Sequence, residues 1–518
     1  MPCSRARQRG SIALRTRRLA NRAGHLFASA ARHSDKVAIW FEGRAISFGE
    51  LAGRVRSAAA LLAARKIGHG THVGIMLPNS PEFIVVQQAL FALGAVASPL
   101  NTFYRQSEVA HAIASCDLEY LILPPEFADR VPEDFAGALV WQSDSGDAAP
   151  PLELQPVSPA DVVMLLHTSA TTGKSKGVML TAANLAANYD PSPGWLGLSG
   201  DDTILCALPL YNTFGLNHCI NAMALTGLTL VLHRKFDAAA CIADIARYRC
   251  TYLPAVPTML QKLVDHPGLK PGELSSLRRI MTGGAPVPAP LLARVLQATG
   301  GQAQVLTGYG LTEASALVTL TQVEMGADGE LLHGRTIGRV LEGMELAVRG
   351  EDGTDLEQGE VGEFVVRGPN VMAGYYNAPD ANTAVFDRGW LRTGDLGYID
   401  PDGYAFIVDR KKDVIIRGGQ NIYPADIEEV LYQLPDVAEV AVVGLADDML
   451  GEVPVAFVAG VAGACLSIDV MMRHCESHLA RFKLPARIHI LPELPKGPTG
   501  KILRRALRQD LKFPGAVP

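Results

Sequence analysis

The hydrophobic pattern alternates between two periods over roughly the first 360 residues. Apolar residues recur at helical spacing over 48–64 and again over 81–93, whereas 73–77 is a short apolar run that turn residues close. Similar short runs return at 203–207, 229–233, 278–282 and 304–307. Short apolar runs that alternate with amphipathic helices are typical of parallel strands covered by helices. The pattern therefore predicts an α/β fold for this part of the chain.

The pattern changes near residue 360. Residues 362–367 and 403–408 alternate like strands, and a charged stretch follows at 409–413. Beyond it, 424–434 has the apolar stripe of an amphipathic helix, followed by strand-like runs. We therefore predict a large N-terminal domain of helix-covered mixed sheets at 25–408. A small, mobile C-terminal α+β domain at 409–518 is expected to act as its lid.

Composition narrows the class of protein. The chain has 518 residues, 48% hydrophobic and 19% charged, with a net charge of −6, so two or more globular domains are expected and nucleic-acid binding is not. No apolar run reaches the roughly 18 residues of a spanning helix. Eight scattered cysteines without a C-x-x-C pair predict reduced, mostly buried thiols in a cytoplasmic protein.

Residues 1–24 are rich in arginine and contain no acidic residue. We predict a disordered basic tail here. The composition also resembles an organelle transit peptide, and a start codon placed too early is a further alternative.

A loop suited to phosphate follows the apolar run at 162–167. It contains hydroxyl residues, glycines and lysines: Thr168, Ser169, Ala170, Thr171, Thr172, Gly173, Lys174, Ser175, Lys176 and Gly177. Hydroxyls, free backbone N–H groups and lysine charge can surround a polyphosphate. The loop is not a Walker A motif, because Thr168 stands where that motif requires glycine. A plain surface loop is the alternative.

Further along the chain, three segments carry groups that suit a nucleotide. The small residues Gly284 and Ala285 would let a flat base approach the backbone, and Tyr309 offers a ring for stacking. Thr312 supplies a hydroxyl and Glu313 a hard carboxylate oxygen suited to Mg²⁺. The carboxylate of Asp395 can accept hydrogen bonds from two ribose hydroxyls.

These motifs, in this order over about residues 25–510, resemble the adenylate-forming superfamily of acyl-CoA synthetases, adenylation domains and luciferases. The family's phosphate loop reads T-S-G-T-T-G-x-P-K-G, and this sequence departs from it at Ala170 and Ser175. The resemblance implies an ATP site with a metal bound at Thr168 and Glu313. Its residues would be Thr168, Ser169, Ala170, Thr171, Thr172, Gly173, Lys174, Lys176, Gly284, Ala285, Gly308, Tyr309, Gly310, Asp395, Arg410 and Lys501.

The same resemblance implies roles in the second half of the chain. Lys501, in a motif similar to P-x-x-x-x-G-K-I, would be the catalytic lysine and act together with Thr312 and Glu313. Asp409 would be the hinge of the small domain, and Gly418 and Gly419 would line the tunnel for the thiol of coenzyme A.

The implied activity is that of an AMP-forming carboxylic acid:CoA ligase, which uses ATP, Mg²⁺ and coenzyme A. The acyl pocket would include Tyr211, Asn212, Phe214 and Gly215, although histidine is common where Asn212 stands. Because the segment 208–216 has no charged residue, we predict a medium- or long-chain fatty acid as substrate, with an aryl acid as the alternative. Loading of a phosphopantetheinyl carrier protein remains open. A non-catalytic nucleotide binder is disfavoured, because Thr172, Glu313, Asp395 and Lys501 are present.

Overall fold

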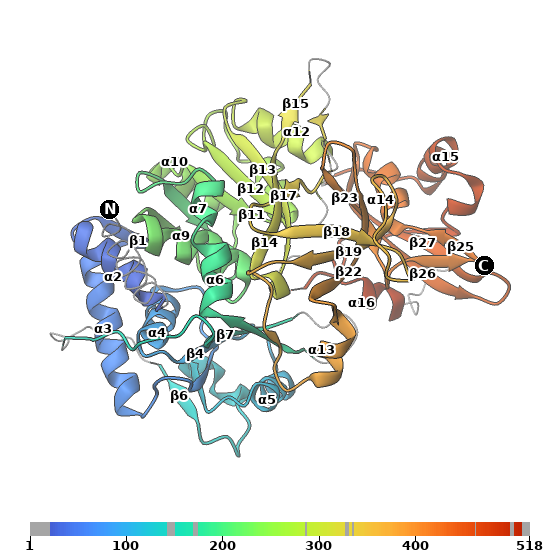
Figure 1. The fold of residues 1–518 in the computed structure, drawn as a ribbon. Helices are drawn as coiled ribbons and strands as arrows, with labels where there is room; N and C mark the ends of the chain where they lie inside the picture. The colour runs from blue at the N-terminus through green and yellow to red at the C-terminus, as the bar shows by residue number, and fades with distance from the viewer. Residues whose placement is uncertain are drawn as a thin grey trace, which may run out of the picture.

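The computed structural model describes residues 21–141, 151–168, 175–284, 287, 289–326, 331–333, 336–461, 463–497 and 502–509. Three larger sheets form the N-terminal part and a fourth forms the C-terminal part (Figure 1). The predicted class is confirmed: a large domain of helix-covered mixed sheets is followed by a smaller α+β domain.

The first sheet has nine strands in the order β17-β14-β13-β12-β11-β9-β10-β1-β2. Its six central strands, from β13 to β1, are parallel, and antiparallel strands close both edges. The strands are β1 (Val37–Phe41), β2 (Arg44–Ser47), β9 (Thr203–Cys206), β10 (Thr229–Leu232), β11 (Tyr252–Ala255), β12 (Arg279–Gly283), β13 (Gln304–Leu311), β14 (Ala316–Gln322) and β17 (Arg339–Val340).

The second sheet has seven strands in the order β20-β8-β7-β4-β3-β5-β6, parallel from β7 to β6. They are β3 (His72–Ile75), β4 (Val96–Pro99), β5 (Tyr120–Leu123), β6 (Ala138–Val140), β7 (Val162–His167), β8 (Gly177–Thr181) and β20 (Gly374–Tyr375). The third sheet is antiparallel and contains β18 (Glu345–Arg349), β19 (Gly362–Arg367), β21 (Phe386–Asp387), β22 (Trp390–Ile399) and β23 (Ala405–Arg410). A short hairpin joins β15 (Glu324–Met325) to β16 (Leu331–Leu332).

Local signals explain why the helices form where they do. Helix α3 (Phe48–Ala64) begins after Ser47, whose hydroxyl accepts from the Glu50 N–H, and α4 (Pro81–Ala92) begins after Ser80 with proline at its first position. The other helices of the large domain are α2 (Ala23–Arg32), α5 (Gln106–Ser115), η1 (Pro125–Arg130), α6 (Ala182–Tyr189), α7 (Ser192–Trp195), α8 (Thr213–Gly215), η2 (Leu216–Asn221), α9 (Ala222–Thr226), α10 (Ala238–Tyr248), α11 (Pro257–Val264), α12 (Ala289–Ala298), η3 (Thr312–Ala314) and α13 (Pro379–Val385).

The C-terminal domain has its own hydrophobic core. Its sheet contains β24 (Ile415–Arg417), β25 (Gln420–Ile422), β26 (Val437–Asp447), β27 (Gly451–Gly460) and β28 (Arg487–Ile490). Its helices are α14 (Pro424–Tyr432), α15 (Ile468–His478), η4 (Arg481–Lys483) and α16 (Arg504–Gln509). Apolar side chains of α14 and α15 pack with those of this sheet. Figure 1 shows this domain, in orange and red, on the side of the molecule opposite the blue helix α3.

Two features differ from the sequence predictions. The predicted tail extends to residue 24, whereas Arg22 is 5% exposed and Ala23 is fully buried, so the end of the predicted tail belongs to the fold. The reason is tertiary, because Arg22 forms an ion pair with Asp190 and a hydrogen bond with Asn221. Strand β13 also continues beyond the predicted run through Gly308, Tyr309 and Gly310, because antiparallel pairing with β14 extends it.

Seven cysteines lie in the described part of the chain as free thiols, six of them buried, as predicted. No helix in the described ranges is long and apolar enough to cross a membrane.

Candidate active site

Tyr309, Asp395 and Arg410 are brought together from three strands. The Tyr309 hydroxyl donates to Asp395 Oδ2 at 2.6 Å, and Arg410 Nε lies 2.9 Å from Asp395 Oδ1. Asp395 is 4% exposed, whereas half of the Arg410 side chain is exposed. Burial and the neighbouring Asp395 carboxylate raise the pKa of Tyr309, so this hydroxyl stays protonated and can donate. Three residues predicted to bind adenine and ribose are therefore in contact.

Glu313 is held by a residue that sequence reasoning missed. Glu313 lies in η3, and the hydroxyl of Tyr375 in β20 donates to its Oε1 at 2.8 Å. The ammonium of Lys176 lies 5.2 Å from the centre of the same Tyr375 ring, within the range of a cation–π contact. Tyr375 thus links the predicted metal ligand to the end of the phosphate loop. Tyr375 lies in β20, a strand of two residues that pairs with β8, and so short a strand has no periodic pattern in the sequence.

The base of the phosphate loop is closed by hydrogen bonds between its two ends. The Thr168 N–H donates to the Lys176 carbonyl at 3.1 Å, and the Ser175 hydroxyl donates to the Thr168 carbonyl at 2.9 Å. Ser175, which replaces the family's proline, therefore ties the loop ends together. The predicted ATP ligands Ser169, Ala170, Thr171, Thr172, Gly173 and Lys174 lie outside the described residues, as do Ala285 and Lys501.

The glycines of the 308–313 motif have a reason in strand packing. A Cβ atom on Gly308 would lie 2.6 Å from the Thr319 carbonyl, and one on Gly310 would overlap the Ala316 carbonyl. Gly284 is exposed and has a φ of +77°, which favours glycine. The close approach of β13 and β14 therefore requires Gly308 and Gly310 whether or not a nucleotide contacts them, and their ATP contact stays a prediction.

The predicted acyl-pocket residues lie at the start of an unusual helix. Tyr211 precedes α8, which continues directly into the π-helix η2, a form often found at functional sites. The Tyr211 hydroxyl is buried and has no hydrogen-bond partner among the described residues. The Phe214 ring packs edge-on against His218, with centroids 4.8 Å apart. Burial lowers the pKa of His218 to about 3, so the pocket segment carries no positive charge at this position at neutral pH.

The remaining members of this segment have backbone roles. Asn212 precedes α8 and its carbonyl accepts from the Leu216 N–H at 2.9 Å. A Cβ atom on Gly215 would lie 2.5 Å from the Pro209 carbonyl. A side chain at this position would therefore push the helix away from the preceding turn.

Asp409 lies at the junction of the two domains. It belongs to β23 of the large domain, yet its carboxylate accepts from the Ala425 N–H of α14 at 3.0 Å and from the Arg410 N–H at 2.7 Å. Burial raises the pKa of Asp409 to about 6, against the opposing effect of Arg504 and these backbone donors. The predicted hinge residue thus caps the first helix of the small domain.

Gly418 and Gly419 form the turn of the hairpin between β24 and β25. Both have positive φ, +56° and +83°, as a tight hairpin turn requires. The Gly418 N–H donates to the Leu450 carbonyl at 2.7 Å. The turn is therefore a defined, exposed feature of the small domain, and its contact with coenzyme A stays a prediction.

The residues present fit a magnesium nucleotide. No group of three or more His, Cys, Asp or Glu side chains in the described ranges could hold a metal by itself. At nucleotide sites Mg²⁺ is held by one or two carboxylates together with phosphate oxygens. Glu313, half-buried and held by Tyr375, is such a carboxylate.

Comparison with known proteins defines the class. The model of the AMP-binding enzyme family matches residues 26–376, and that of the AMP-binding enzyme C-terminal domain matches 426–501. The chain therefore belongs to the AMP-binding enzyme family. It is 38% identical over 493 residues to the indoleacetate–CoA ligase of Aromatoleum aromaticum, covering 92% of this chain and 95% of that protein.

Two solved structures are similar over almost the whole chain. The o-succinylbenzoate CoA synthetase of Bacillus subtilis with an acyl-adenylate has a TM-score of 0.83 and 32% identity, covering 95% of this chain and 98% of that chain. ATP-bound MatB from Rhodopseudomonas palustris has a TM-score of 0.87 and 30% identity, covering 95% of this chain and 99% of that chain. Apo MatB has a TM-score of only 0.77. The chain therefore superposes better on the ATP-bound form of that protein than on its apo form.

The predicted enzyme class, an AMP-forming acid–thiol ligase that uses ATP, Mg²⁺ and coenzyme A, is confirmed. The predicted preference for a fatty acid has no support among these relatives, two of which are named for aromatic acids.

Proposed function

We propose that this enzyme activates an aromatic or arylalkanoic carboxylic acid. The aryl acid, which was the alternative in the sequence analysis, thus replaces the fatty acid as the proposed substrate. The observation that carries the proposal is the ring-rich acyl segment, in which Phe214 packs against the neutral His218 and Tyr211 has an unpartnered hydroxyl. Aromatic side chains favour edge-on and offset contacts with a substrate ring. A buried tyrosine hydroxyl needs a hydrogen-bond partner, which a polar ring substituent can supply.

In the first half-reaction the acid's carboxylate attacks the α-phosphorus of ATP and pyrophosphate leaves. We assign Asp395 and Arg410 to the ribose and Tyr309 to the adenine, since their contacts already join them in one cluster. Glu313 and Thr168 are the proposed ligands of Mg²⁺, which neutralises phosphate charge when bound. Thr312, the phosphate-loop residues 168–174 and Lys176 are assigned to the phosphates, and Lys501 to the charge that develops between carboxylate and α-phosphate.

In the second half-reaction the thiol of coenzyme A attacks the acyl carbonyl and AMP leaves. No side-chain nucleophile is required, so the residues act by positioning and by electrostatic stabilisation. We propose that the small domain turns about Asp409 between the two steps and brings Gly418 and Gly419 to the thiol. The contact that supports a pivot here is the hydrogen bond from the Ala425 N–H of α14 to Asp409, which lies in β23 of the large domain.

A panel of acids with ATP, Mg²⁺ and free coenzyme A tests the proposal. The panel contains benzoic, phenylacetic, indole-3-acetic and 4-hydroxycinnamic acids and straight-chain acids from hexanoic to palmitic acid. We expect AMP and pyrophosphate as products and the highest kcat/KM with an aromatic acid. A higher kcat/KM with a straight-chain acid contradicts the substrate proposal. Turnover only with a holo carrier protein contradicts the proposal that coenzyme A is the acyl acceptor.

A further inference from the structure

The chain on both sides of Lys501 is fixed to the body of the small domain. Lys496 and Ile502 form an antiparallel bridge, and the Leu503 N–H donates to the Pro495 carbonyl at 2.8 Å. Lys501 itself lies outside the described residues, and Ile502 is the next residue in the chain. Whatever holds Ile502 in place therefore holds the residue that directly follows Lys501 in the chain.

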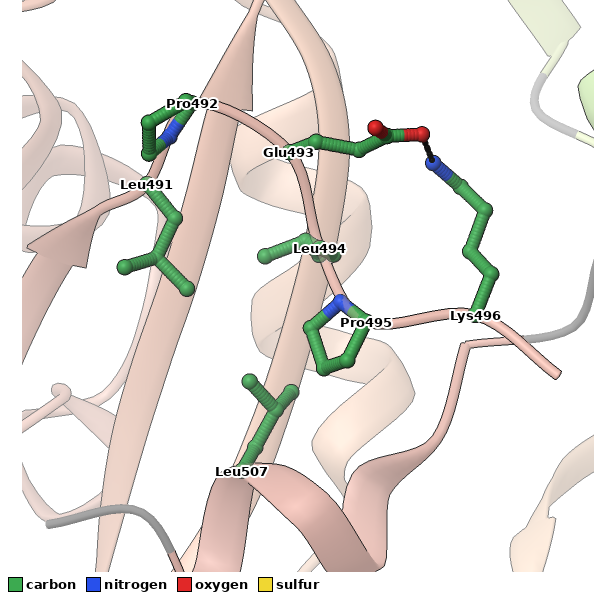
Figure 2. Close-up of a pocket in the computed structure, with 7 residues that line it drawn as sticks. All are labelled: Leu491, Pro492, Glu493, Leu494, Pro495, Lys496 and Leu507. Carbon is green, nitrogen blue, oxygen red and sulfur yellow. Dashed lines mark hydrogen bonds and ion pairs between the residues drawn. The ribbon is translucent and has the colours of Figure 1, made fainter.

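Lys496 anchors the first side of this bridge. Its ammonium lies 2.7 Å from Glu439 Oε1 in β26 and 2.8 Å from Glu493 Oε1. Figure 2 shows its side chain reaching back along the segment to Glu493. Only 13% of the Lys496 side chain is exposed, and Glu439 also accepts from the Leu494 N–H at 3.2 Å. Burial lowers the pKa of Lys496, but the hydrogen bonds to both carboxylates outweigh it and raise this pKa, so the ammonium stays charged.

Arg504 anchors the second side. Its guanidinium makes two hydrogen bonds to the Glu428 carboxylate, at 2.6 and 3.0 Å, and one to the Val442 carbonyl at 2.6 Å. Glu428 belongs to α14, the helix that Asp409 caps. A continuous set of contacts thus runs from Asp409 through α14 to the residues that flank Lys501, and a rotation at Asp409 would carry both flanks as one unit.

A charged side chain that is paired on a solvent-exposed surface contributes little to the stability of the structure around it. Lys496 differs because its bond to Glu439 is largely shielded from water and joins the bridge to β26, the edge strand that pairs with β27. The side chain of Glu439 is 17% exposed, whereas that of Glu493 is 65% exposed. The Glu439 contact therefore carries most of the anchoring.

We propose that Lys496, opposite Ile502 and bound to Glu439, is a positioning residue for the adenylation half-reaction. Lys496 acts through Lys501, and the proposal therefore rests on the role proposed for that lysine. It holds the bridge at a fixed distance from the sheet, and so sets where the Lys501 ammonium reaches when the domains are in the adenylation arrangement. The residue has no part in thioester formation, which uses the Gly418–Gly419 side of the domain.

The test uses Lys496→Met in the full-length enzyme, which keeps the length and apolar stem of the side chain but removes the charge. We measure pyrophosphate release with the best acid of the panel, and thioester formation from pre-formed acyl-adenylate and coenzyme A. The kcat of adenylation should fall about 10-fold, because a shift of about 1 Å at a charge-stabilising group costs up to about 100-fold. The KM for ATP and the thioester rate should stay within about 2-fold of wild type.

Three further variants decide between explanations. Lys496→Arg should restore most of the adenylation rate, because a guanidinium can also reach both carboxylates. Lys483→Met is the matched control, since Lys483 is bound 2.6 Å from Asp426 in the same domain but away from the bridge; it should leave both half-reactions unchanged. Lys501→Ala reports on the proposed function itself.

If Lys501→Ala impairs adenylation but Lys496→Met does not, the positioning role is wrong while the proposed function stands. If neither variant impairs adenylation, the role assigned to Lys501 is wrong as well. Equal losses in both half-reactions together with a lower unfolding temperature for Lys496→Met would make Lys496 a structural residue only, and would overturn the inference.

Discussion

Replacement of Tyr211 by phenylalanine gives opposite effects on stability and on substrate choice. The Tyr211 hydroxyl is buried without a hydrogen-bond partner among the described residues. Burial raises the pKa of Tyr211, so the group is neutral and able to donate. An unsatisfied buried polar group costs about 1–3 kcal/mol. Tyr211→Phe should therefore raise the free energy of unfolding of the ligand-free enzyme by about 1 kcal/mol, which corresponds to an increase of about 1–2 °C in Tm for a domain of this size.

The same substitution should weaken selection for a polar substituent on the substrate ring. If the Tyr211 hydroxyl binds such a substituent, its loss removes a neutral hydrogen bond worth about 1 kcal/mol. The ratio of kcat/KM for 4-hydroxyphenylacetate to that for phenylacetate should then fall about 5-fold, since about 1.4 kcal/mol corresponds to 10-fold. Steady-state AMP release with both acids, and differential scanning fluorimetry without ligand, measure the two effects.

Tyr189→Phe is a matched control for both measurements. Tyr189 also has a buried hydroxyl without a partner among the described residues, but it lies in α6 and outside the predicted acyl segment. Its replacement should raise Tm similarly and leave the ratio of the two acids unchanged. A fall in Tm for Tyr211→Phe would refute the interpretation of its hydroxyl as unsatisfied. An unchanged ratio would refute its contact with the substrate ring.

Two further predictions concern charged groups at the site. Asp395→Asn should raise the KM for ATP about 10- to 100-fold, because hydrogen bonds to a charged group contribute about 1.5–3 kcal/mol. The affinity for AMP, measured by isothermal titration calorimetry, should fall as well. A change in this affinity of less than about 2-fold would contradict the assignment of Asp395 to the ribose. Asp409 has a folded-state pKa of about 6, above its unfolded value of about 3.9, so its ionisation costs stability as pH rises from about 4 to about 6. Asp409→Asn should therefore gain Tm relative to wild type at pH 7.5 but not at pH 3.5, and an equal difference at both pH values would contradict the raised pKa.

Much of the fold could be predicted from the sequence because its determinants are local. The helical spacing of apolar residues predicts 48–64, and helix α3 is Phe48–Ala64. The alternation at 362–367 matches β19 in the same way. These elements follow from side-chain period and from capping residues within a few positions of each other. The order of the motifs was sufficient to indicate the family, because each motif is a short run with a fixed spacing.

Only the tertiary structure decided which of these groups meet. Tyr309 and Asp395 are 86 positions apart and Tyr375 and Glu313 are 62 apart, so no local pattern reports their hydrogen bonds. The capping of α14 by Asp409 likewise depends on how β23 meets the small domain. The Tyr211 hydroxyl illustrates the physical reason: its chemical type is written in the sequence, but burial without a partner is a property of everything that surrounds it.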